Sequence, residues 1–217
     1  MADGAPRYDR PGPGERLNTG AVKPARPAAS VMVLRDPGPE VLLVQRNPDA
    51  RFMGGAWVFP GGAVHDEDAA PSETATRELE EEAGVSIAEH ADLVPFSRWI
   101  TPAEVDVRFD TWFFVVEAPA DAEPVCDGEE CVDVRWLTPS AALEEYANGE
   151  LLLVFPTIKH LEQFSSFESS DALVAHAAAH DVVPVQPRIV LSGETARVLL
   201  PGEPGYDAAN DGGNAPG

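Results

Sequence analysis

The run RELEEE near the middle of the chain crowds four glutamates around one arginine. On a helix, which turns about 100° per residue, Glu78, Glu81 and Glu82 share one face, while Glu80 points elsewhere. Carboxylates three and four residues apart repel by roughly 0.2–0.5 kcal/mol per pair. Hard divalent cations such as Mg²⁺ and Mn²⁺ take carboxylate oxygens as ligands and relieve this repulsion. The run therefore indicates a metal site, although an acidic run by itself is more often a solvated helix face.

Two glycines and two helix-end signals surround this run. Gly61 and Gly62 have no Cβ, so their backbone can come close to a metal ion or a phosphate and offer a carbonyl oxygen. Pro71 suits the first turn of a helix, and Gly84 suits the position just after its end. A helix over residues 71–83 would bury its small and apolar side chains against a sheet. The carboxylates would then be fixed beside the glycines.

Strands and helices alternate along the rest of the chain. Apolar, β-branched runs between turn residues predict strands, and apolar residues at helical spacing predict helices. The expected strands cover residues 29–35, 41–46, 57–59, 93–100, 109–117 and 131–137, with a terminal hairpin of 188–191 and 196–200. Further helices are expected to start at residues 138–140 and to cover 156–167 and 171–180. This order predicts an α/β layered domain with a mixed sheet.

The length of 217 residues fits one domain with tails better than two domains. Residues 1–27 and 201–217 are rich in proline and glycine and almost free of large apolar side chains. Such segments cannot bury enough apolar surface to order themselves, so we expect a flexible tail at each end. A single folded domain with a C-terminal extension is expected over residues 28–200.

The charge balance excludes one class of partner. The 37 acidic side chains outnumber the 15 basic ones, for a formal net charge of −22, and a nucleic-acid backbone would be repelled. The N-terminus has no apolar signal region, and no stretch approaches about 18 consecutive apolar residues. We therefore expect a cytoplasmic protein with neither nucleic acid nor a membrane as partner.

Two further sets of residues could bind metals, and the sequence favours plainer explanations. Cys126 and Cys131 are too few for a disulfide framework and lack the CxxC spacing of common zinc sites, so we interpret them as buried or incidental thiols. His176 and His180 are four residues apart, a spacing that can bind zinc, but neither a third ligand nor a glutamate completes the motif. They are better explained as a polar helix edge.

The segment Arg77–Val85, which reads RELEEEAGV, fits the second half of the pattern G-x5-E-x7-R-E-U-x-E-E-x-G-U, where U is bulky and apolar. That pattern is the Nudix box, and the chain resembles the Nudix hydrolases over residues 28–150. The first half departs from it, because the family's glutamate and glycine fall on Ala69 and Ala63. The loop after the glycines is thus one residue longer. Glu67 or Asp68 would then take the role of the loop acid, which anchors the loop through the box arginine.

The resemblance implies a Nudix-type α/β/α sandwich with a mixed sheet, here followed by a C-terminal helical extension. It also implies a Mg²⁺- or Mn²⁺-dependent attack of water on a phosphoanhydride. Carried over by position, Glu78, Glu81 and Glu82 are metal ligands, and the carbonyl of Gly61 is a further candidate. The general base varies within the family, so Glu78, Glu81 and Glu130 remain candidates for catalytic roles. Glu130, next to Glu129, lies where some members bring in a loop glutamate; a solvated loop is the alternative.

Substrate contacts are expected from arginines and from the flanking sequence. Arg46 ends an apolar strand and could reach phosphates, with help from Arg51 or Arg108; a surface or ion-paired role is the alternative for each. The segments RNPDARFMGGAWVFPGG, SRWITP, RFDTWFF and FPTIKHLEQF resemble the branch that includes peroxisomal coenzyme A diphosphatases.

Three descriptions of the activity stay open at this point. The substrate expected from the resemblance is a small nucleoside diphosphate derivative, either CoA- or acyl-CoA-like or of the ADP-ribose or NADH type. The third description is a Nudix-fold ligand-binding regulatory module without turnover. The resemblance is compatible with a homodimer.

Overall fold

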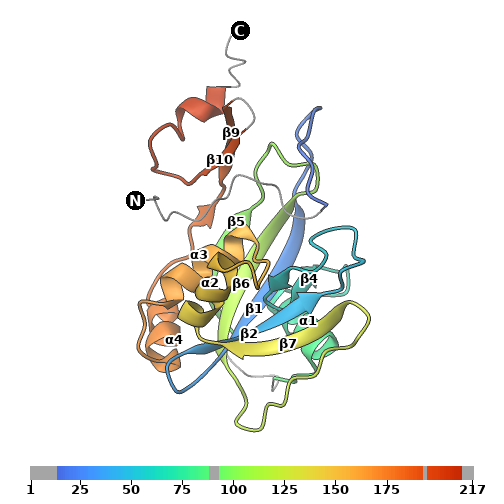
Figure 1. Cartoon of the computed structure of the whole chain (residues 1–217), viewed down its shortest axis with the longest axis vertical. Helices are drawn as coiled ribbons and strands as arrows, with labels where there is room; N and C mark the ends of the chain where they lie inside the picture. The colour runs from blue at the N-terminus through green and yellow to red at the C-terminus, as the bar shows by residue number, and fades with distance from the viewer. Residues whose placement is uncertain (1–13, 88–92, 193–194, 212–217) are drawn as a thin grey trace.

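The computed structural model describes residues 14–87, 93–192 and 195–211 of the chain (Figure 1). The strands are β1 (Arg26–Arg35), β2 (Glu40–Arg46), β3 (Trp57–Val58), β4 (Gly61–Ala63), β5 (Val94–Ile100), β6 (Phe109–Glu117), β7 (Cys131–Leu137), β8 (Pro184–Val185), β9 (Arg188–Ser192) and β10 (Thr195–Leu199). The helices are α1 (Pro71–Ala83), α2 (Pro139–Ala147), α3 (Phe155–Phe164), α4 (Ser170–Ala178) and the 3₁₀ helix η1 (Ala208–Asp211).

Strand β1 is the centre of the main sheet. Within the described residues this sheet has eight strands, in the order β3-β2-β1-β6-β5-β8, with β4 paired to β1 and β7 paired to β2. β6 runs parallel to β1 along nearly its whole length, from Arg26 opposite Phe109 to Leu34 opposite Glu117. β2 and β4 therefore share the other edge of β1, both antiparallel to it. The glycine segment is thus paired directly to the central strand.

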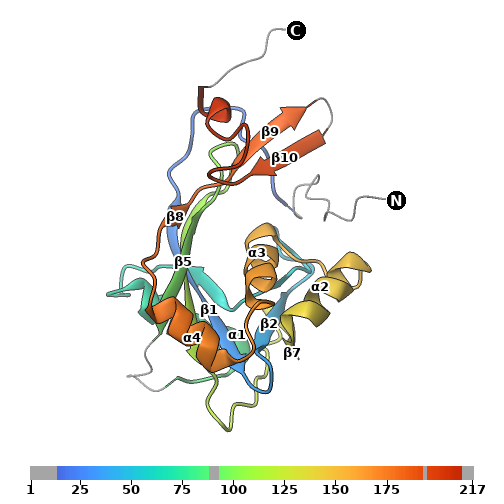
Figure 2. The same ribbon diagram turned by 90° about the vertical axis from the view of Figure 1, so that its left-hand side faces the viewer.

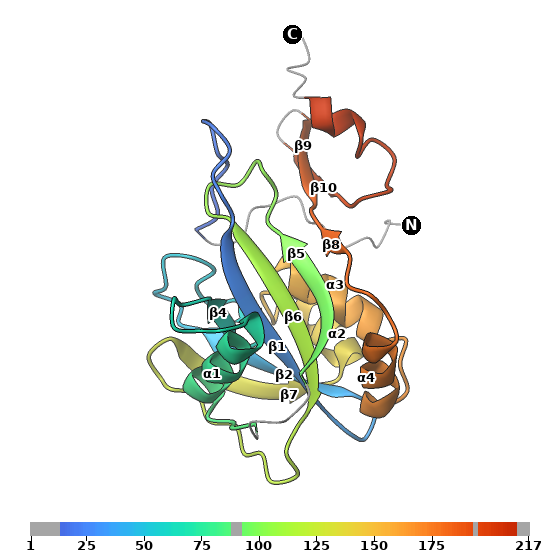
Figure 3. The same cartoon turned by 180° about the vertical axis from the view of Figure 1, so that it is seen from behind.

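The sheet is covered by helices on both faces, which confirms the predicted α/β/α sandwich. Helix α1 lies on one face, and α2, α3 and α4 lie on the other (Figures 2 and 3). The side chains of β1 alternate between the two: Met32 and Leu34 pack with the three-helix side, and Val31 and Val33 pack with α1. Because both faces of β1 are buried, its sequence reads as a continuous apolar run.

Most predicted elements are confirmed, with differences at some ends. α1, β6 and β7 have the predicted bounds, and the terminal hairpin forms as β9 and β10, with residues 193–194 outside the described ranges. α3 ends at Phe164 rather than at residue 167, because Phe167 turns back to donate its N–H to the carbonyl of Phe164 at 3.0 Å. β4 and the two-residue β8 were not predicted, since a glycine pair and a two-residue strand have no recognisable pattern of alternation.

The N-terminal segment was expected to be a tail up to residue 27, and this is wrong for its described part. Leu17 forms a β-bridge with Val105, and the N–H of Asn18 donates to the carbonyl of Glu104 at 2.7 Å. β1 itself begins at Arg26. These contacts are made by the backbone, so the proline- and glycine-rich composition gave no sign of them. Residues 1–13 of the expected tail lie outside the described residues.

The C-terminal segment, expected to be a tail from residue 201, also has structure in its described part. The 3₁₀ helix η1 follows Tyr206, whose hydroxyl donates to the carbonyl of Gln186 at 2.7 Å. The guanidinium of Arg188 lies 4.8 Å from the centre of the Tyr206 ring. This segment therefore supports the base of the terminal hairpin. The extent of the single domain, residues 28–200, stays a prediction.

All helices in the described ranges are short, the longest being the 13-residue α1. None of them is long and apolar enough to span a lipid bilayer.

His160 of α3 is buried where this helix packs against the sheet. His160 is 1% exposed, its Nε2 lies 2.6 Å from the hydroxyl of Ser97, and its ring is surrounded by aromatic side chains such as Phe113, 4.5 Å away between ring centres. Burial lowers the pKa of His160 to about 3. The ring therefore stays neutral in the fold under ordinary conditions.

We expect acid to destabilise the protein through His160. An unfolded histidine takes up a proton below about pH 6.5, whereas the folded one does not until about pH 3. The free energy of unfolding should therefore fall by about 1.4 kcal/mol per pH unit below pH 6.5 from this group and be unaffected by it above that value. Urea unfolding at pH 7.0 and 5.5 should show a smaller loss in His160→Met than in the native sequence. Equal losses in the two proteins would contradict this origin.

Candidate active site

Helix α1 is fixed to the sheet by its small and apolar face. Ala75, Leu79 and Ala83 have no exposed surface and pack in the core between α1 and the sheet. Gly84 ends the helix in the left-handed conformation, with φ 63°, and donates its N–H to the carbonyl of Glu80 at 3.0 Å. The acidic residues on the adjacent stripe are consequently held at a defined place along the sheet edge.

Glu78 lies directly against the second glycine of β4. An ideal Cβ built on Gly62 would lie 2.3 Å from Oε1 and 2.8 Å from Oε2 of Glu78, so only glycine leaves room for this carboxylate. Glu78 is 8% exposed. Burial raises the pKa of Glu78 above its ordinary value, against the opposing effect of the Arg77 guanidinium. The site therefore holds a carboxylate that is short of positive charge.

Glu82 is more deeply buried than Glu78, and its contacts are neutral groups. It is 2% exposed, and its Oε2 accepts the N–H of Gly61 at 2.9 Å. The buried thiol of Cys131 donates a hydrogen bond to the same carboxylate. Burial, reinforced by the charge of Glu78, raises the pKa of Glu82 to about 7. A nearby cation would lower this pKa again, because it stabilises the ionised carboxylate.

The carbonyl of Gly61 faces away from β1. In the antiparallel β1–β4 ladder the pairs alternate, and Val31 donates to the carbonyl of Pro60, so the neighbouring pair of Ser30 and Gly61 is not bonded across the ladder. The N–H and carbonyl of Gly61 therefore point out of the β4 edge, where the N–H meets Glu82. The role of this carbonyl as a metal ligand stays a prediction.

Arg77 is the centre of an ion-pair network on the same helix. Its Nη1 donates to Oε1 of Glu78 at 2.8 Å and to Oε2 of Glu81 at 3.0 Å. Its Nη2 donates to Oδ2 of Asp68 at 3.1 Å. Arg77 thus supplies the positive charge that offsets the like charges of its helix, and Glu81, with an exposed side chain, is the most accessible of the three predicted ligands.

Asp68, and not Glu67, takes the role of the loop acid. Its Oδ2 accepts the N–H of His65 at 2.9 Å and the hydroxyl of Thr74 at 2.8 Å, in addition to Arg77. The Arg77 guanidinium holds the pKa of Asp68 well below its usual range. Glu67 is exposed. The extra loop residue therefore leaves the anchor between the loop and the helix intact.

The oxygen atoms gathered here are of the chemical kind that a hard divalent cation binds. They comprise two buried carboxylates, one accessible carboxylate and an outward-facing carbonyl, all oxygen donors of the kind that Mg²⁺ and Mn²⁺ accept. The space that a Cβ on Gly62 would fill is occupied by the Glu78 carboxylate. Throughout the described parts of the chain, however, no three His, Cys, Asp or Glu side chains are gathered around one point. Glu78 and Glu81 are each bonded to Nη1 of Arg77.

These carboxylates form one end of a large cleft. The cleft has a volume of about 1030 Å³ and is lined by Glu78, Glu81, Glu82 and Arg46, and further along by aromatic and aliphatic side chains. Small-molecule sites usually measure about 300–1,000 Å³. The cleft can therefore accommodate a ligand larger than the diphosphate group alone.

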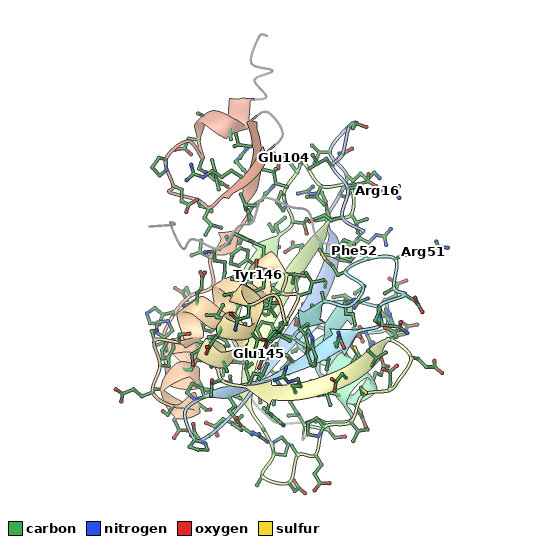
Figure 4. The ribbon with its side chains drawn as sticks, viewed as in Figure 1. Arg16, Arg51, Phe52, Glu104, Glu145 and Tyr146 are labelled. Atoms are coloured by element: carbon green, nitrogen blue, oxygen red, sulfur yellow. The ribbon has the colours of Figure 1, made fainter. Side chains whose placement is uncertain are left out.

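Of the three arginines predicted to contact substrate, the structure brings only Arg46 to the cleft. Its Nε is buried and has no hydrogen-bond partner among the described residues, and its charge acts on Glu82. Arg51 is exposed and points outward from the loop after β2 (Figure 4). Arg51 does not line the cleft.

Arg108 has a structural role, so its predicted substrate contact is not supported. It is 8% exposed, and its guanidinium donates to the carbonyls of Thr101, Pro102 and Lys23. All three partners are backbone carbonyls of irregular segments, which have no sequence signature for such a contact. Arg108 thus ties the N-terminal segment to the loop between β5 and β6.

Glu130 lines the cleft and Glu129 does not, while the catalytic role suggested for Glu130 stays a prediction. The carbonyl of Glu130 accepts the N–H of Asn47 at 2.8 Å, and its own N–H donates to Asp127 at 2.8 Å. These bonds fix the loop before β7 next to the end of β2. The Glu130 side chain is exposed, and its charge contributes to the raised pKa of Glu78.

Two features of the site were not predicted. Cys131 was interpreted as a buried or incidental thiol. It is buried, and its thiol also forms a hydrogen bond with the Glu82 carboxylate. Burial and the Glu82 charge raise the pKa of Cys131, so the thiol keeps its proton. The apolar part of the cleft was missed because its residues come from segments far apart in the sequence. Neither feature has a local sequence signal.

Three comparisons relate the chain to known proteins. The family model described as NUDIX domain matches residues 24–156. "Putative nudix hydrolase 7" of Caenorhabditis elegans is 24% identical over 218 residues, covering 82% of this chain and 73% of that protein. "Putative 8-oxo-dGTP diphosphatase 3" of Mycobacterium tuberculosis is 33% identical over 118 residues, 52% of each protein. The crystal structure of a NUDIX hydrolase from Alicyclobacillus acidocaldarius has a TM-score of 0.64 at 26% identity, covering 71% of this chain and 97% of that one.

The two glycines of β4 allow activity and stability to be separated. A Cβ at position 62 would meet only the flexible end of Glu78, whereas a Cβ at position 61 would lie 2.5 Å from the carbonyl of Ala29 and 2.7 Å from Cα of Ser30. We expect Gly62→Ala to displace the carboxylate and weaken Mn²⁺ binding about 10- to 100-fold with little loss of stability. Gly61→Ala should instead lower the free energy of unfolding by about 1–3 kcal/mol, since backbone must move.

Paramagnetic resonance of free Mn²⁺ and urea unfolding would measure the two effects. The glycine-to-alanine change is the same in both variants, so each controls for the other. Unchanged Mn²⁺ binding in Gly62→Ala would refute the assigned place of Glu78.

Proposed function

Because the chain belongs to the NUDIX domain family, we propose that it uses a divalent cation to hydrolyse a phosphoanhydride bond in a small nucleoside diphosphate derivative. The family model covers more than half of the chain, and relatives over this region are named as Nudix hydrolases. The chain is thus an enzyme of the pyrophosphohydrolase type. Its substrate and the roles of individual residues are the content of the proposal.

The observation that carries the proposal is the position of the α1 carboxylates next to the two glycines of β4. Glu78 and Glu82 are buried with raised pKa values, and Glu81 is within reach of solvent beside them. With the carbonyl of Gly61 they would hold Mg²⁺ or Mn²⁺, the ions that enzymes of this family generally use. Such an ion, when bound, neutralises charge on the diphosphate oxygens and lowers the pKa of a coordinated water.

The protein's own groups have separate tasks in this scheme. Arg46 would bind a phosphate oxygen, because its guanidinium lies in the cleft next to Glu82. Glu81 and Glu130 are the exposed carboxylates of the site and can take the proton from the attacking water. Arg77 and Asp68 position the loop and the helix relative to each other without touching substrate. A strongly negative protein can thereby bind a polyanion.

A substrate panel would separate the remaining candidates. Purified protein with Mg²⁺ or Mn²⁺ would be incubated with CoA, acyl-CoA, ADP-ribose, NADH, dinucleoside polyphosphates and nucleoside triphosphates, including an oxidised dGTP. The mycobacterial relative's name motivates the last of these. Release of two phosphate-bearing products from one class identifies the substrate. Binding of a panel member without any turnover would favour the alternative of a regulatory module. The CoA diphosphatase branch, the cytoplasmic location and a homodimer stay predictions.

We expect Glu82→Gln and Glu81→Gln each to lower kcat by roughly 100-fold or more, since a neutral amide is a poor ligand for a hard cation. Glu80→Gln is the matched control, because Glu80 is exposed and its carboxylate accepts a hydrogen bond from Ser86, outside the site, at 3.1 Å. Rates would be measured on the best substrate of the panel at saturating Mn²⁺, with unfolding curves for all three variants. Full activity in Glu82→Gln would exclude the proposed ligand set.

A further inference from the structure

The cleft continues well beyond the carboxylates into a part with different chemistry. We define the apolar arm by six side chains that line the same cleft and are partly exposed to it: Phe52, Ile100, Phe109, Phe155, Ile189 and Val198. The rings of Phe52 and Phe109 lie 6.1 Å apart, and that of Phe155 lies 6.1 Å from Trp99. Contiguous exposed apolar surface of this kind usually marks a binding site.

The terminal hairpin contributes one face to the apolar arm. Ile189 and Val198 are directly opposite each other on β9 and β10, so their side chains lie on the same face of the hairpin. Both line the cleft, whereas the next pair, Val190 and Arg197, does not. The hairpin stands beyond the ends of β5 and β6, away from α1 (Figures 1 and 2). It therefore closes the end of the cleft opposite the carboxylates.

Specific contacts hold this hairpin in place. The N–H of Ile189 donates to Oε2 of Glu104 at 3.3 Å, and Glu104 lies beside the hairpin (Figure 4). β8, just before β9, pairs with β5 at Arg98 and Trp99. The arm is thus a part of the folded structure.

The charges around the apolar arm differ from those at the other end of the cleft. Apart from the acidic and arginine side chains at the carboxylate end, the charged residues that line the cleft in the described part of the chain are Glu15 and Arg26, which carry opposite charges; Arg26 is paired in register with Phe109. Arg46 and Arg77 are at the carboxylate end. No lysine lines the cleft in the described part of the chain. The arm would therefore bind a further phosphate group poorly and an uncharged group well.

One wall of the apolar arm, the hairpin face with Ile189 and Val198, lies outside the matched domain, whereas Phe52, Ile100, Phe109 and Phe155 lie inside it. The family match ends at residue 156, and Ile189 and Val198 lie 30 residues or more beyond it. Hydrolysis of a diphosphate does not require these residues. The apolar side chains of this segment have a function if they bind the part of the substrate that does not react.

We propose that the apolar arm binds an uncharged, extended hydrocarbon group that is esterified to the diphosphate of the substrate. This inference rests on the proposed function, because it names the second half of the molecule that the same site would hydrolyse. Binding energy comes from the removal of apolar surface from water on both the hydrocarbon and the arm. Each methylene that becomes buried should tighten binding roughly two- to fourfold.

The test uses a series of probes that differ only in this group. ADP esterified on its β-phosphate with methyl, butyl or octyl alcohol would be given to the full chain with Mn²⁺, below the micelle-forming concentration, and release of AMP followed. Dissociation constants would be measured by calorimetry with EDTA present, so that binding is recorded without turnover. We expect both kcat/KM and affinity to rise at least about tenfold from the methyl to the octyl ester.

Two hairpin variants locate the effect. Ile189→Asp places a charge in the arm, and Val190→Asp places the same charge on the opposite face of the same strand. The octyl-to-methyl ratio should fall to near one in Ile189→Asp and stay as in the native protein in Val190→Asp. Ile189→Thr, a milder change with the same β-branching, serves if the aspartate variant does not fold; it should reduce the ratio at least threefold.

Each outcome supports or overturns one statement. Hydrolysis of all esters with no dependence on chain length overturns the hydrocarbon site and leaves the proposed function standing. No hydrolysis of any ester overturns the use of ADP esters as substrates, and the calorimetric series still decides whether the arm binds the chain. A ratio lost equally in Ile189→Asp and Val190→Asp shows that the hydrocarbon binds elsewhere and overturns the arm.

Discussion

The burial of carboxylates on one side of α1 is the constraint on which the rest of the site depends. Glu78 and Glu82 are removed from water, and the ionised form of a buried carboxylate without a cation costs several kcal/mol. Arg77 offsets part of this cost, and it is itself held by Asp68. The apolar stripe of α1, the glycines of β4 and the anchored loop together keep these carboxylates in a buried position, although hydration would favour their exposure to solvent. Stability is therefore given up locally at the place where we propose that a cation binds.

The parts of this arrangement that could be predicted are those with a local chemical cause. The bounds of α1 follow from Pro71 and Gly84, whose backbone preferences act at the two helix ends. The shared face of Glu78, Glu81 and Glu82 follows from the helix period alone. The sandwich follows from the alternation of strands and helices, together with the resemblance carried by the box residues.

What could not be predicted depends on contacts between distant segments. Nothing in the sequence distinguishes Asp68 from Glu67 as the partner of Arg77, because the choice depends on the path of a loop with an extra residue. Arg108 and Arg46 look alike in sequence, yet one binds backbone carbonyls and the other faces the cleft. The pairing of the glycines with β1 and the apolar arm likewise appear only when the chain is folded. Local pattern thus predicted the chemistry, and tertiary contacts decided which residues could take part in it.

The two ends of the cleft differ in how far apart in the sequence their contacting residues lie. Residues 61–82, a single short stretch paired with β1, supply the three carboxylates and both glycines of the cleft. The hairpin end depends on a contact between Ile189 and Glu104, 85 residues apart in the sequence. Closing so long a loop loses chain entropy before any contact compensates for it, which slows folding. The hairpin joins the sheet through β8 at the edge strand β5, so we expect local unfolding to open this end of the cleft before the end next to the central strand.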